Sequence, residues 1–214
     1  MNLFRWSWVV GNGDVIVDKL VQHVQLTSLA LVFGLCIAFP LALAAIRWPR
    51  LYGPSLGATG VAFTIPSLAL FILLIPFTGL SMATSLIGLT IYTLLILFRN
   101  IVEGFNGVPR DVREAARAMG YTRTRQLFTV ELPIALPVII AGIRIATVTT
   151  IGLVTVTALI GQGGLGQLFI TGFTLHFPTP LLVGFVLSVL LAVIADLLLV
   201  GAERVLTPWR RGRG

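Results

Sequence analysis

Long apolar runs alternate with short polar segments along this chain of 214 residues. Residues 20–46, 51–98 and 145–195 contain no Asp, Glu, Lys or Arg. One helical crossing of a bilayer needs only about 20 apolar residues, so the first run has room for one crossing and each longer run contributes to two. Helices are expected because a helix satisfies its own backbone groups inside lipid.

The pattern therefore predicts an all-α integral membrane protein with about five transmembrane helices in a single domain, residues 1–214. We place the membrane spans at residues 24–46, 56–77, 81–98, 135–160 and 179–200. The composition agrees, because 57% of the residues are hydrophobic and only 11% are charged, whereas charged residues make up about 25% of a soluble domain.

The arginines predict the orientation of these spans. Arg47 and Arg50 follow the first span, a cluster between Arg99 and Arg125 follows the third, and further arginines follow the last. Because basic residues near short loops stay on the cytosolic side, the N-terminus should lie outside and the C-terminus in the cytosol. The net charge of +7 is then a topology signal. It does not indicate nucleic-acid binding, because the arginines are divided among loops.

The N-terminal segment Met1–Lys19 is not a convincing signal peptide, because its apolar patch is short and Asp14 and Asp18 follow it. Trp6 and Trp8 suit the headgroup level of a bilayer. We therefore expect this segment to lie along the outer membrane interface before the first span. The single cysteine, Cys36, has no partner for a disulfide within the chain.

Residues 99–133 form a polar segment between the third and fourth spans, and we expect a cytosolic loop there. Its apolar positions recur at helical spacing, with charged positions between them, as in an amphipathic helix: Val108, Val112, Ala115, Ala116 and Met119. Pro109 suits the first turn, and Gly120 can adopt the left-handed conformation that ends a helix. Thr122 can cap a second short helix through Leu127 and Phe128. Composition alone leaves open a plain solvated loop.

The spacing inside this loop resembles the EAA loop of ABC importer permeases. Glu114-Ala115-Ala116 is followed after three residues by Gly120, and after nine more by Val130-Glu131-Leu132-Pro133. Val130 departs from the pattern, which usually has Ile there. The resemblance implies a coupling helix that docks on a cytosolic ATPase and transmits its closure to the membrane helices.

Carried over residue by residue, the resemblance makes Glu114, Ala115, Ala116 and Gly120 the docking elements. The two small alanines permit close approach of a partner, and Glu114 can accept a charge-assisted hydrogen bond. Arg113 and Arg117 flank these residues and can tune docking electrostatically.

Further motifs resemble permeases of the osmoprotectant branch, which take up glycine betaine, choline, carnitine and related solutes. They are Leu26-Thr27-Ser28-Leu29, Ile65-Pro66-Ser67-Leu68-Ala69-Leu70, Leu97-Phe98-Arg99-Asn100, Ala141-Gly142-Ile143-Arg144 and Leu159-Ile160-Gly161-Gln162-Gly163-Gly164-Leu165-Gly166. The alternative within the same class is a permease for another small polar solute, such as an amino acid.

The resemblance also implies the partners and the location. It implies the type I importer permease fold and a prokaryotic cytoplasmic membrane. The expected partners are a second permease subunit, identical or homologous, a cytosolic ABC ATPase dimer and a separate extracytoplasmic binding protein. ATP and Mg would bind the ATPase, because a P-loop needs a lysine and the sole lysine here is Lys19. We expect no cofactor or metal in this chain.

Two ionisable residues lie inside predicted spans at similar depths, Arg144 in the fourth and Asp196 in the fifth. Intramembrane charges usually face a protein interior, so we hypothesise an ion pair between these helices. Alternatively, each residue snorkels or pairs elsewhere. If the chain were instead an ion-coupled secondary transporter, these two residues would be the relay.

Three other features lead to hypotheses of their own. A kink at Pro66, with Thr64 and Ser67 beside it, would expose polar groups to a substrate path, although simple packing remains open. The glycine-rich segment 161–166 would shape an outer gate or receptor contact, or act as a plain connector. His23 and His176 are expected at the outer boundary without metal-ligand spacing. No catalytic constellation can be assembled, so we do not expect an enzyme.

Overall fold

The structure is a computed structural model that describes residues 4–209, and within that range its regular elements are helices without any strand. In chain order they are α1 (Trp6–Gly11), α2 (Gly13–Arg47), the 3₁₀ turn η1 (Pro49–Leu51), α3 (Tyr52–Thr64), α4 (Ser67–Thr78), α5 (Met82–Asn106), α6 (Arg110–Ala118), α7 (Arg123–Gln126), the π-helical turn η2 (Leu127–Glu131), α8 (Leu132–Val156), the 3₁₀ turn η3 (Thr157–Ile160), α9 (Gly166–Thr174) and α10 (Pro178–Leu206).

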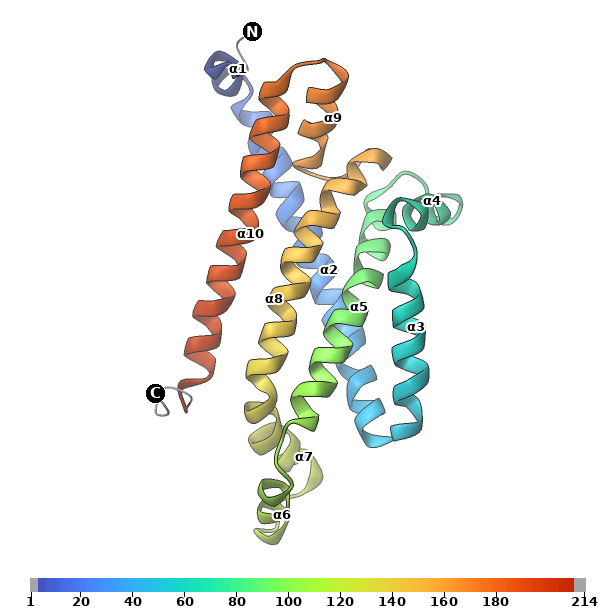
Figure 1. Cartoon of the computed structure of the whole chain (residues 1–214), viewed down its shortest axis with the longest axis vertical. Helices are drawn as coiled ribbons and strands as arrows, with labels where there is room; N and C mark the ends of the chain where they lie inside the picture. The colour runs from blue at the N-terminus through green and yellow to red at the C-terminus, as the bar shows by residue number, and fades with distance from the viewer. Residues whose placement is uncertain (1–3, 210–214) are drawn as a thin grey trace.

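The long helices α2, α5, α8 and α10 run roughly along the long axis of the molecule, and α5 packs on both α2 and α8 (Figure 1). Among residues 4–209, four helices are long and apolar enough to cross a membrane, or five if α3 and α4 count as one broken span. Helices α6 and α7 lie together at one end, whereas α1, α4 and α9 lie toward the other. The chain therefore places its polar loop at one pole of a helical bundle.

Small residues allow the central helices to approach closely. Ala30, Gly34, Ala38 and Ala42 recur every fourth residue and form a buried stripe along α2. A Cβ atom at Gly34 would overlap the hydroxyl of Thr93 on α5. On the other side of α5, a Cβ at Gly104 would lie 2.9 Å from the carbonyl oxygen of Ala135 on α8. Such small-residue contacts are typical of helix packing inside membranes, where van der Waals contact drives association.

The span expected at residues 56–77 is not one straight helix. Helices α3 and α4 meet at an angle of 97°, and between them Ile65 is extended and Pro66 has non-helical angles of φ −55° and ψ 132°. Pro66 has no N–H and disfavours helical geometry at the residue before it. The carbonyl oxygen of Ile65 instead accepts a hydrogen bond from the hydroxyl of Tyr92 on α5. The expected kink is therefore a full break.

Several helices also extend beyond the predicted boundaries. Helix α5 continues past Arg99 to Asn106, so the loop expected at 99–133 begins about two turns later. The helix continues because Ile101, Val102 and Phe105 are buried at helical spacing, and charged residues on its exposed side do not stop it. Helix α10 likewise runs through Asp196 to Leu206.

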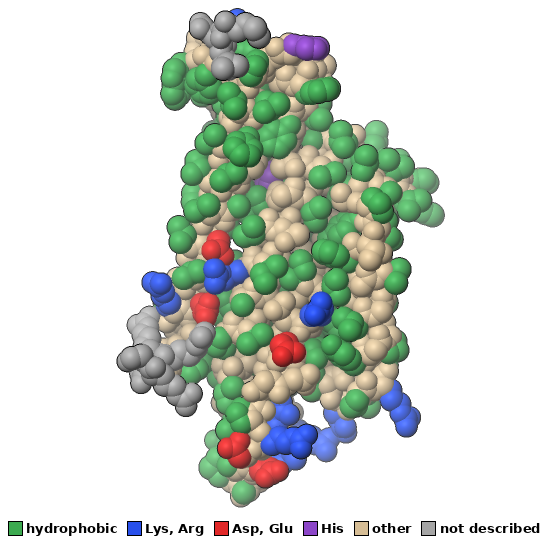
Figure 2. Space-filling model, viewed as in Figure 1, with side chains coloured by type: hydrophobic (Ala, Val, Ile, Leu, Met, Phe, Trp, Pro, Cys, Tyr) green, Lys and Arg blue, Asp and Glu red, His purple; other side chains and the backbone are tan. Residues whose placement is uncertain are grey.

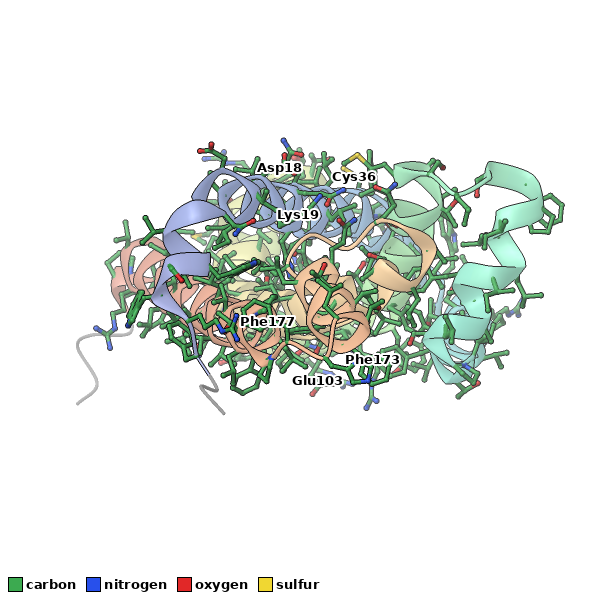
Figure 3. The ribbon with its side chains drawn as sticks, turned by 90° about the horizontal axis from the view of Figure 1, so that it is seen from above. Asp18, Lys19, Cys36, Glu103, Phe173 and Phe177 are labelled. Atoms are coloured by element: carbon green, nitrogen blue, oxygen red, sulfur yellow. The ribbon has the colours of Figure 1, made fainter. Side chains whose placement is uncertain are left out.

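The N-terminal segment is only partly as expected. Residues 13–19 belong to α2, which begins at Gly13; residues 1–3 lie outside the described part. The short helix α1 packs at the start of α10, where the Arg5 backbone N–H donates to Thr179 Oγ1 at 3.0 Å. The rings of Trp8 and Phe177 are 6.0 Å apart, edge to face, and Figure 3 shows Phe177 beside α1. These contacts fix α1 against the bundle.

Most of helix α10 is not buried by neighbouring elements of the chain. Its buried residues are Thr179, Pro180 and Gly184, all in its first two turns. Seen from above, α10 and the α3–α4 pair occupy opposite ends of the molecule (Figure 3). Beyond Gly184 its apolar side chains are exposed or half-buried and none is fully buried, so polar contacts with α8 add to the packing of this part of the helix.

Candidate functional site

The predicted coupling loop forms two short helices, α6 and α7, that project from the bundle (Figure 1). Pro109 precedes α6 as its N-cap and does not occupy its first turn. Glu114 and Ala115 are exposed, whereas Ala116 is only 1% exposed. The helix therefore presents one face outward, and Ala116 supports it from beneath.

Of the four residues expected to be docking elements, Ala116 is buried against the chain and the other three are exposed. In a helix, neighbouring residues lie about 100° apart, so Ala115 and Ala116 cannot both face outward while α6 packs on the chain. The outward face carries Glu114, Ala115 and Met119, and the last of these side chains is 67% exposed.

A glycine turn ends α6 as the sequence predicts. Gly120 has φ of +78°, the left-handed conformation that glycine adopts without strain. Its N–H donates to the carbonyl of Arg117 at 2.9 Å, and the N–H of Tyr121 donates to that of Ala116 at 3.1 Å, which together make a Schellman motif. Thr122 Oγ1 then caps α7 by accepting from the N–H of Arg125 at 3.4 Å. The turn sets the direction of α7.

Arg113 joins α6 to the ends of two long helices. Its guanidinium donates to the carbonyl oxygen of Phe105 near the end of α5, and its Nε lies 3.5 Å from Glu131 Oε2. Gln126 Nε2 donates to the other oxygen of Glu131 at 2.7 Å. Arg113 is thus an internal anchor of the loop, where the sequence suggested a flanking charge at the docking surface.

The loop joins α8 through one wide helical turn. Residues Leu127–Glu131 form a π-helical turn, and the N–H of Leu132 donates to the carbonyl of Leu127. Pro133 cannot donate the hydrogen bond that the carbonyl of Thr129 would accept in an α-helix, which favours this widening. The helical path continues directly into α8, so a displacement of α6 and α7 bears on the start of that helix.

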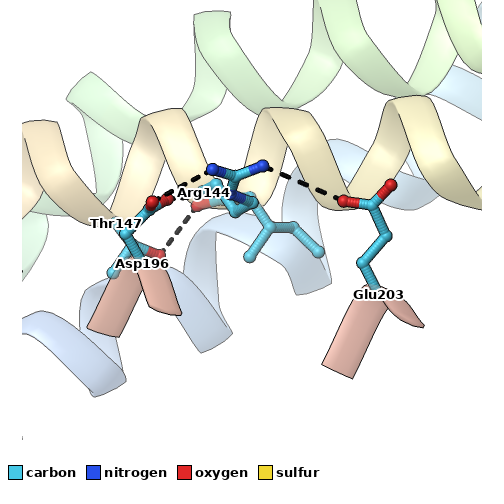
Figure 4. A network of polar contacts seen from close by, with 5 residues as sticks. Arg144, Thr147, Asp196 and Glu203 are labelled. Carbon is cyan, nitrogen blue, oxygen red and sulfur yellow. Dashed lines mark hydrogen bonds and ion pairs between the residues drawn. The ribbon is translucent and has the colours of Figure 1, made fainter. Parts of the chain in front are cut away.

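Arg144 and Asp196 meet between α8 and α10 (Figure 4). Arg144 Nε donates to Oδ1 at 2.7 Å and Nη2 donates to Oδ2 at 3.0 Å, the bidentate geometry that arginine favours with carboxylates. Glu203 approaches Arg144 Nη1 at 3.9 Å. The structure thus forms the pair that the sequence suggested and adds Glu203 on the same face of α10.

Thr64, Pro66 and Ser67 lie together at the α3–α4 break. The hydroxyl of Thr64 donates to the carbonyl of Val61 at 2.7 Å, so it is satisfied by its own helix. The ring of Phe63 packs edge to face on Tyr92 at 5.8 Å. The break thus combines polar groups and aromatic rings, and its role in a substrate path stays a hypothesis.

The glycine-rich segment 161–166 packs tightly against α2. The N–H of Gly164 donates to Gln22 Oε1 at 3.1 Å, and Gln22 Nε2 donates to Gln162 Oε1 at 3.1 Å. A Cβ at Gly164 would lie 2.7 Å from the backbone of His23. The segment therefore holds the top of α2 against η3 and α9.

The two histidines have different surroundings. His23, which the sequence places near the outer boundary of the membrane, is fully buried within the protein, and its Nε2 lies 3.0 Å from the carbonyl oxygen of Ile151. It is a packed residue because the glycine segment covers it. His176 is exposed in the α9–α10 turn with φ of 51°. Among residues 4–209, no group of three or more His, Cys, Asp or Glu residues could hold a metal ion.

Sequence reasoning did not assign roles to Glu131, Glu203 or Gln22. Glu131 stands inside the Val-Glu-Leu-Pro motif, yet its neighbours in space, Arg113 and Gln126, come from other turns of the loop. Glu203 follows Asp196 by seven residues, two helical turns, which puts both on one face of α10. That spacing was a usable signal. Nothing local indicated the contact of Gln22.

Comparison with known proteins gives consistent matches. Residues 30–207 match the family described as binding-protein-dependent transport system inner membrane component. The choline transport system permease protein OpuBB of Bacillus subtilis is 35% identical over 197 residues, covering 92% of this chain and 91% of that relative. The osmoprotectant import permease protein OsmW of Salmonella typhimurium is 36% identical over 206 residues, covering 94% and 96%.

Solved structures show the same fold. An inward-facing MetNI methionine ABC transporter superposes with a TM-score of 0.81 at 22% identity, covering 92% of this chain and 98% of that one. An amino acid ABC transporter superposes with a TM-score of 0.78 at 19% identity, covering 94% and 98%. At these identities the likeness concerns the fold alone.

Proposed function

The chain belongs to the family of binding-protein-dependent transport system inner membrane components, and from this premise we propose that it is the permease subunit of an ATP-driven importer for compatible solutes such as glycine betaine, choline or carnitine. Its fold is that of type I ABC importer permeases. The relatives named for choline and osmoprotectant transport support the substrate class. The chain itself is a transport subunit and not an enzyme.

The observation that carries this proposal is the exposed face of α6. Glu114 and Ala115 point away from the bundle, while Arg113 fixes the same helix to the end of α5 and to Glu131. A soluble partner that binds Glu114 and Ala115 therefore moves a helix attached to both α5 and α8. We propose that this partner is a cytosolic ABC ATPase dimer, which binds ATP and Mg.

The mechanism we propose is alternating access. Loaded binding protein docks outside, and ATP closes the two ATPase subunits inside. The two α6 helices of a permease pair, identical or homologous, then move together and open the path outward. Hydrolysis separates the ATPases and restores the inward-facing form. The break at Thr64, Pro66 and Ser67 is our proposed contact with the solute.

The orientation follows from charge. The connection after α2, the α6–α7 loop and the C-terminal part of α10 lie toward the same end of the molecule, opposite α1 (Figure 1). Figure 2 shows Lys and Arg side chains gathered at the end that carries α6 and α7. Because basic loops stay on the cytosolic side, we propose a prokaryotic cytoplasmic membrane with the N-terminus outside and the C-terminus in the cytosol.

Reconstitution of the permease with its ATPase and binding protein in liposomes tests the proposal. We expect uptake of labelled choline or glycine betaine that requires ATP and saturates as the binding protein is filled. ATP-dependent uptake of a labelled amino acid, without uptake of choline or glycine betaine, would indicate an importer for another small polar solute. Uptake that persists without ATP and follows an ion gradient would overturn the proposal.

A further inference from the structure

A cavity of about 690 Å³ lies between the end of α2 and the α6–α7 loop. Its wall on the side of the bundle includes the apolar side chains of Leu43 and Ile46. Four arginines also line it: Arg113, which is held by Glu131, and three from three different elements, Arg47 at the end of α2, Arg117 on α6 and Arg123 on α7. The cavity is therefore apolar on one side and cationic on the other.

The described residues do not balance the positive charge of this cavity. Glu131 also lines it, but Arg113 and Gln126 already bind its two oxygens. Within residues 4–209, Arg47, Arg117 and Arg123 form no ion pair. Like charges gathered around a cavity repel one another, so a bound anion would stabilise this arrangement. Guanidinium groups are especially suited to phosphate, which they bind through paired N–H donors.

The position of the cavity along α2 indicates where that anion comes from. Helix α2 is a candidate membrane span that ends at Arg47, and Trp48 follows it with 58% of its surface exposed. Tryptophan is enriched at the level of lipid headgroups. The apolar wall therefore lies at the level of acyl chains, and the arginines lie at the level of phosphates.

The cavity is also separate from the face of α6 that we assign to the ATPase. Arg113 and Arg117 are one turn apart and line the cavity, whereas Glu114 and Ala115 face outward. Arg117 is itself exposed and three residues from Glu114, so a partner docked on the outward face can reach that arginine, whereas Arg47 and Arg123 lie on other elements. A lipid phosphate inside the cavity would contact all three arginines.

We propose that this cavity binds an anionic phospholipid, with its phosphate on Arg47, Arg117 and Arg123 and its acyl chain against Leu43 and Ile46. Basic pockets beside membrane helices bind lipid headgroups in this way. The bound lipid joins α2 to the α6–α7 loop and so holds the coupling helix in position. Assignment to the inner leaflet rests on the orientation proposed above, whereas lipid binding does not.

Native mass spectrometry of the purified full chain tests this proposal. The probes are phosphatidylglycerol, phosphatidylcholine with the same acyl chains, and inorganic phosphate, each at equal concentration. The test variant is Arg47→Gln with Arg117→Gln and Arg123→Gln. The matched control, Arg50→Gln with Arg99→Gln and Arg110→Gln, removes the same charge from exposed positions outside the cavity.

We expect the wild type and the control to retain phosphatidylglycerol in preference to phosphatidylcholine. The test variant should lose that preference, with affinity lower by on the order of 100-fold, because each arginine contributes about fivefold. Equal retention of both lipids by the wild type, or equal retention of phosphatidylglycerol by both triple variants, would overturn the proposal. Displacement of the lipid by equimolar inorganic phosphate would overturn the lipid assignment in favour of a free-phosphate site. The ATPase is co-purified with each variant in a separate measurement, and its loss from the test variant with unchanged lipid retention would instead assign the arginines to the ATPase.

These results do not depend on transport. A chain that transports no compatible solute but shows the expected lipid retention would contradict the proposed function and leave the lipid site standing. The reverse result would contradict the lipid site alone.

Discussion

Arg144 of α8 binds Asp196 of α10 through two hydrogen bonds of 2.7 and 3.0 Å, at a level where α10 buries none of its own residues. Both side chains remain about one third exposed, at 31% and 33%, so the pair lies at an open seam between the helices. The contact of Glu203 with the same guanidinium makes Arg144 the polar link to the C-terminal half of α10.

Reversal of one charge in this pair should therefore detach the second half of α10. We expect Asp196→Arg to lose most transport, because two arginines would then face each other inside the membrane. The exchange Arg144→Asp with Asp196→Arg should recover part of that loss. Asp18→Arg is the matched control, since Asp18 is 72% exposed and, among the residues that the structure describes, pairs only with its neighbour Lys19. Uptake is measured at equal surface expression, and no recovery in the exchanged pair would count against the link.

The close approach of α5 and α8 at Gly142 should make the stability of the fold sensitive to side-chain size there. A Cβ at Gly142 would overlap the side chain of Asn100, whereas a Cβ at Gly152 on the same helix would meet nothing within 4 Å. We expect Gly142→Ala to destabilise the fold by about 1–3 kcal/mol through overpacking. Gly152→Ala should be neutral or slightly stabilising, since alanine favours helix. The melting temperatures of both variants are measured in detergent from the fraction that remains monodisperse in size-exclusion chromatography. Equal melting temperatures would contradict this packing.

The glycine turn after α6 should be sensitive to backbone conformation and not to volume. Gly120 has open space around its Cβ position but a φ of +78°, which costs other residues roughly 1–2 kcal/mol. We expect Gly120→Val to reduce co-purification of the ATPase and Gly120→Asn to preserve most of it, because asparagine tolerates this conformation. Gly107→Ala, at φ of −70°, is the control. Identical ATPase yields from the Val and Asn variants would argue against a conformational cause.

The backbone amides of the glycine-rich segment 161–166 should exchange hydrogen faster when the side chain of Gln22 is truncated. Gln22 accepts the hydrogen bond of the Gly164 N–H, and one such bond is worth about 1 kcal/mol. We expect Gln22→Ala to raise hydrogen exchange in residues 161–166 about fivefold. The exposed Gln25 makes no side-chain hydrogen bond in the described part of the chain, so Gln25→Ala should leave exchange unchanged. Faster exchange in both variants would contradict the anchoring role of Gln22.

The sequence predicted those features that depend on one local signal. Apolar runs indicated the order of the long helices α2, α5, α8 and α10, although the remaining expected span, at residues 56–77, is a broken pair, and the glycine at position 120 indicated the end of α6. Equal depth of Arg144 and Asp196 in two antiparallel helices was enough to suggest their pairing, because helical rise converts residue number into distance.

Other features depended on partners that are distant in the sequence. Pro40 stays inside α2, whereas Pro66 breaks a helix. The hydroxyl of Tyr92, which is distant in the sequence, stabilises the break at Pro66 by donating to the carbonyl of Ile65. Ala116 could not be distinguished from Ala115, because the face that packs depends on what lies beneath α6. The buried position of His23 likewise follows from a segment more than a hundred residues away.

If α6 docks on an ATPase through its outward face, cross-linking from two adjacent positions will distinguish that face from the packed one. The single cysteine, Cys36, is first replaced by serine. A bifunctional maleimide–succinimide reagent is then applied to the membrane complex of Ala115→Cys and of Ala116→Cys. Because Ala115 is exposed and Ala116 is 1% exposed, we predict a cross-link to the ATPase from position 115 and none from position 116. Absence of a cross-link from position 115, or equal cross-linking from both positions, would contradict docking through that face.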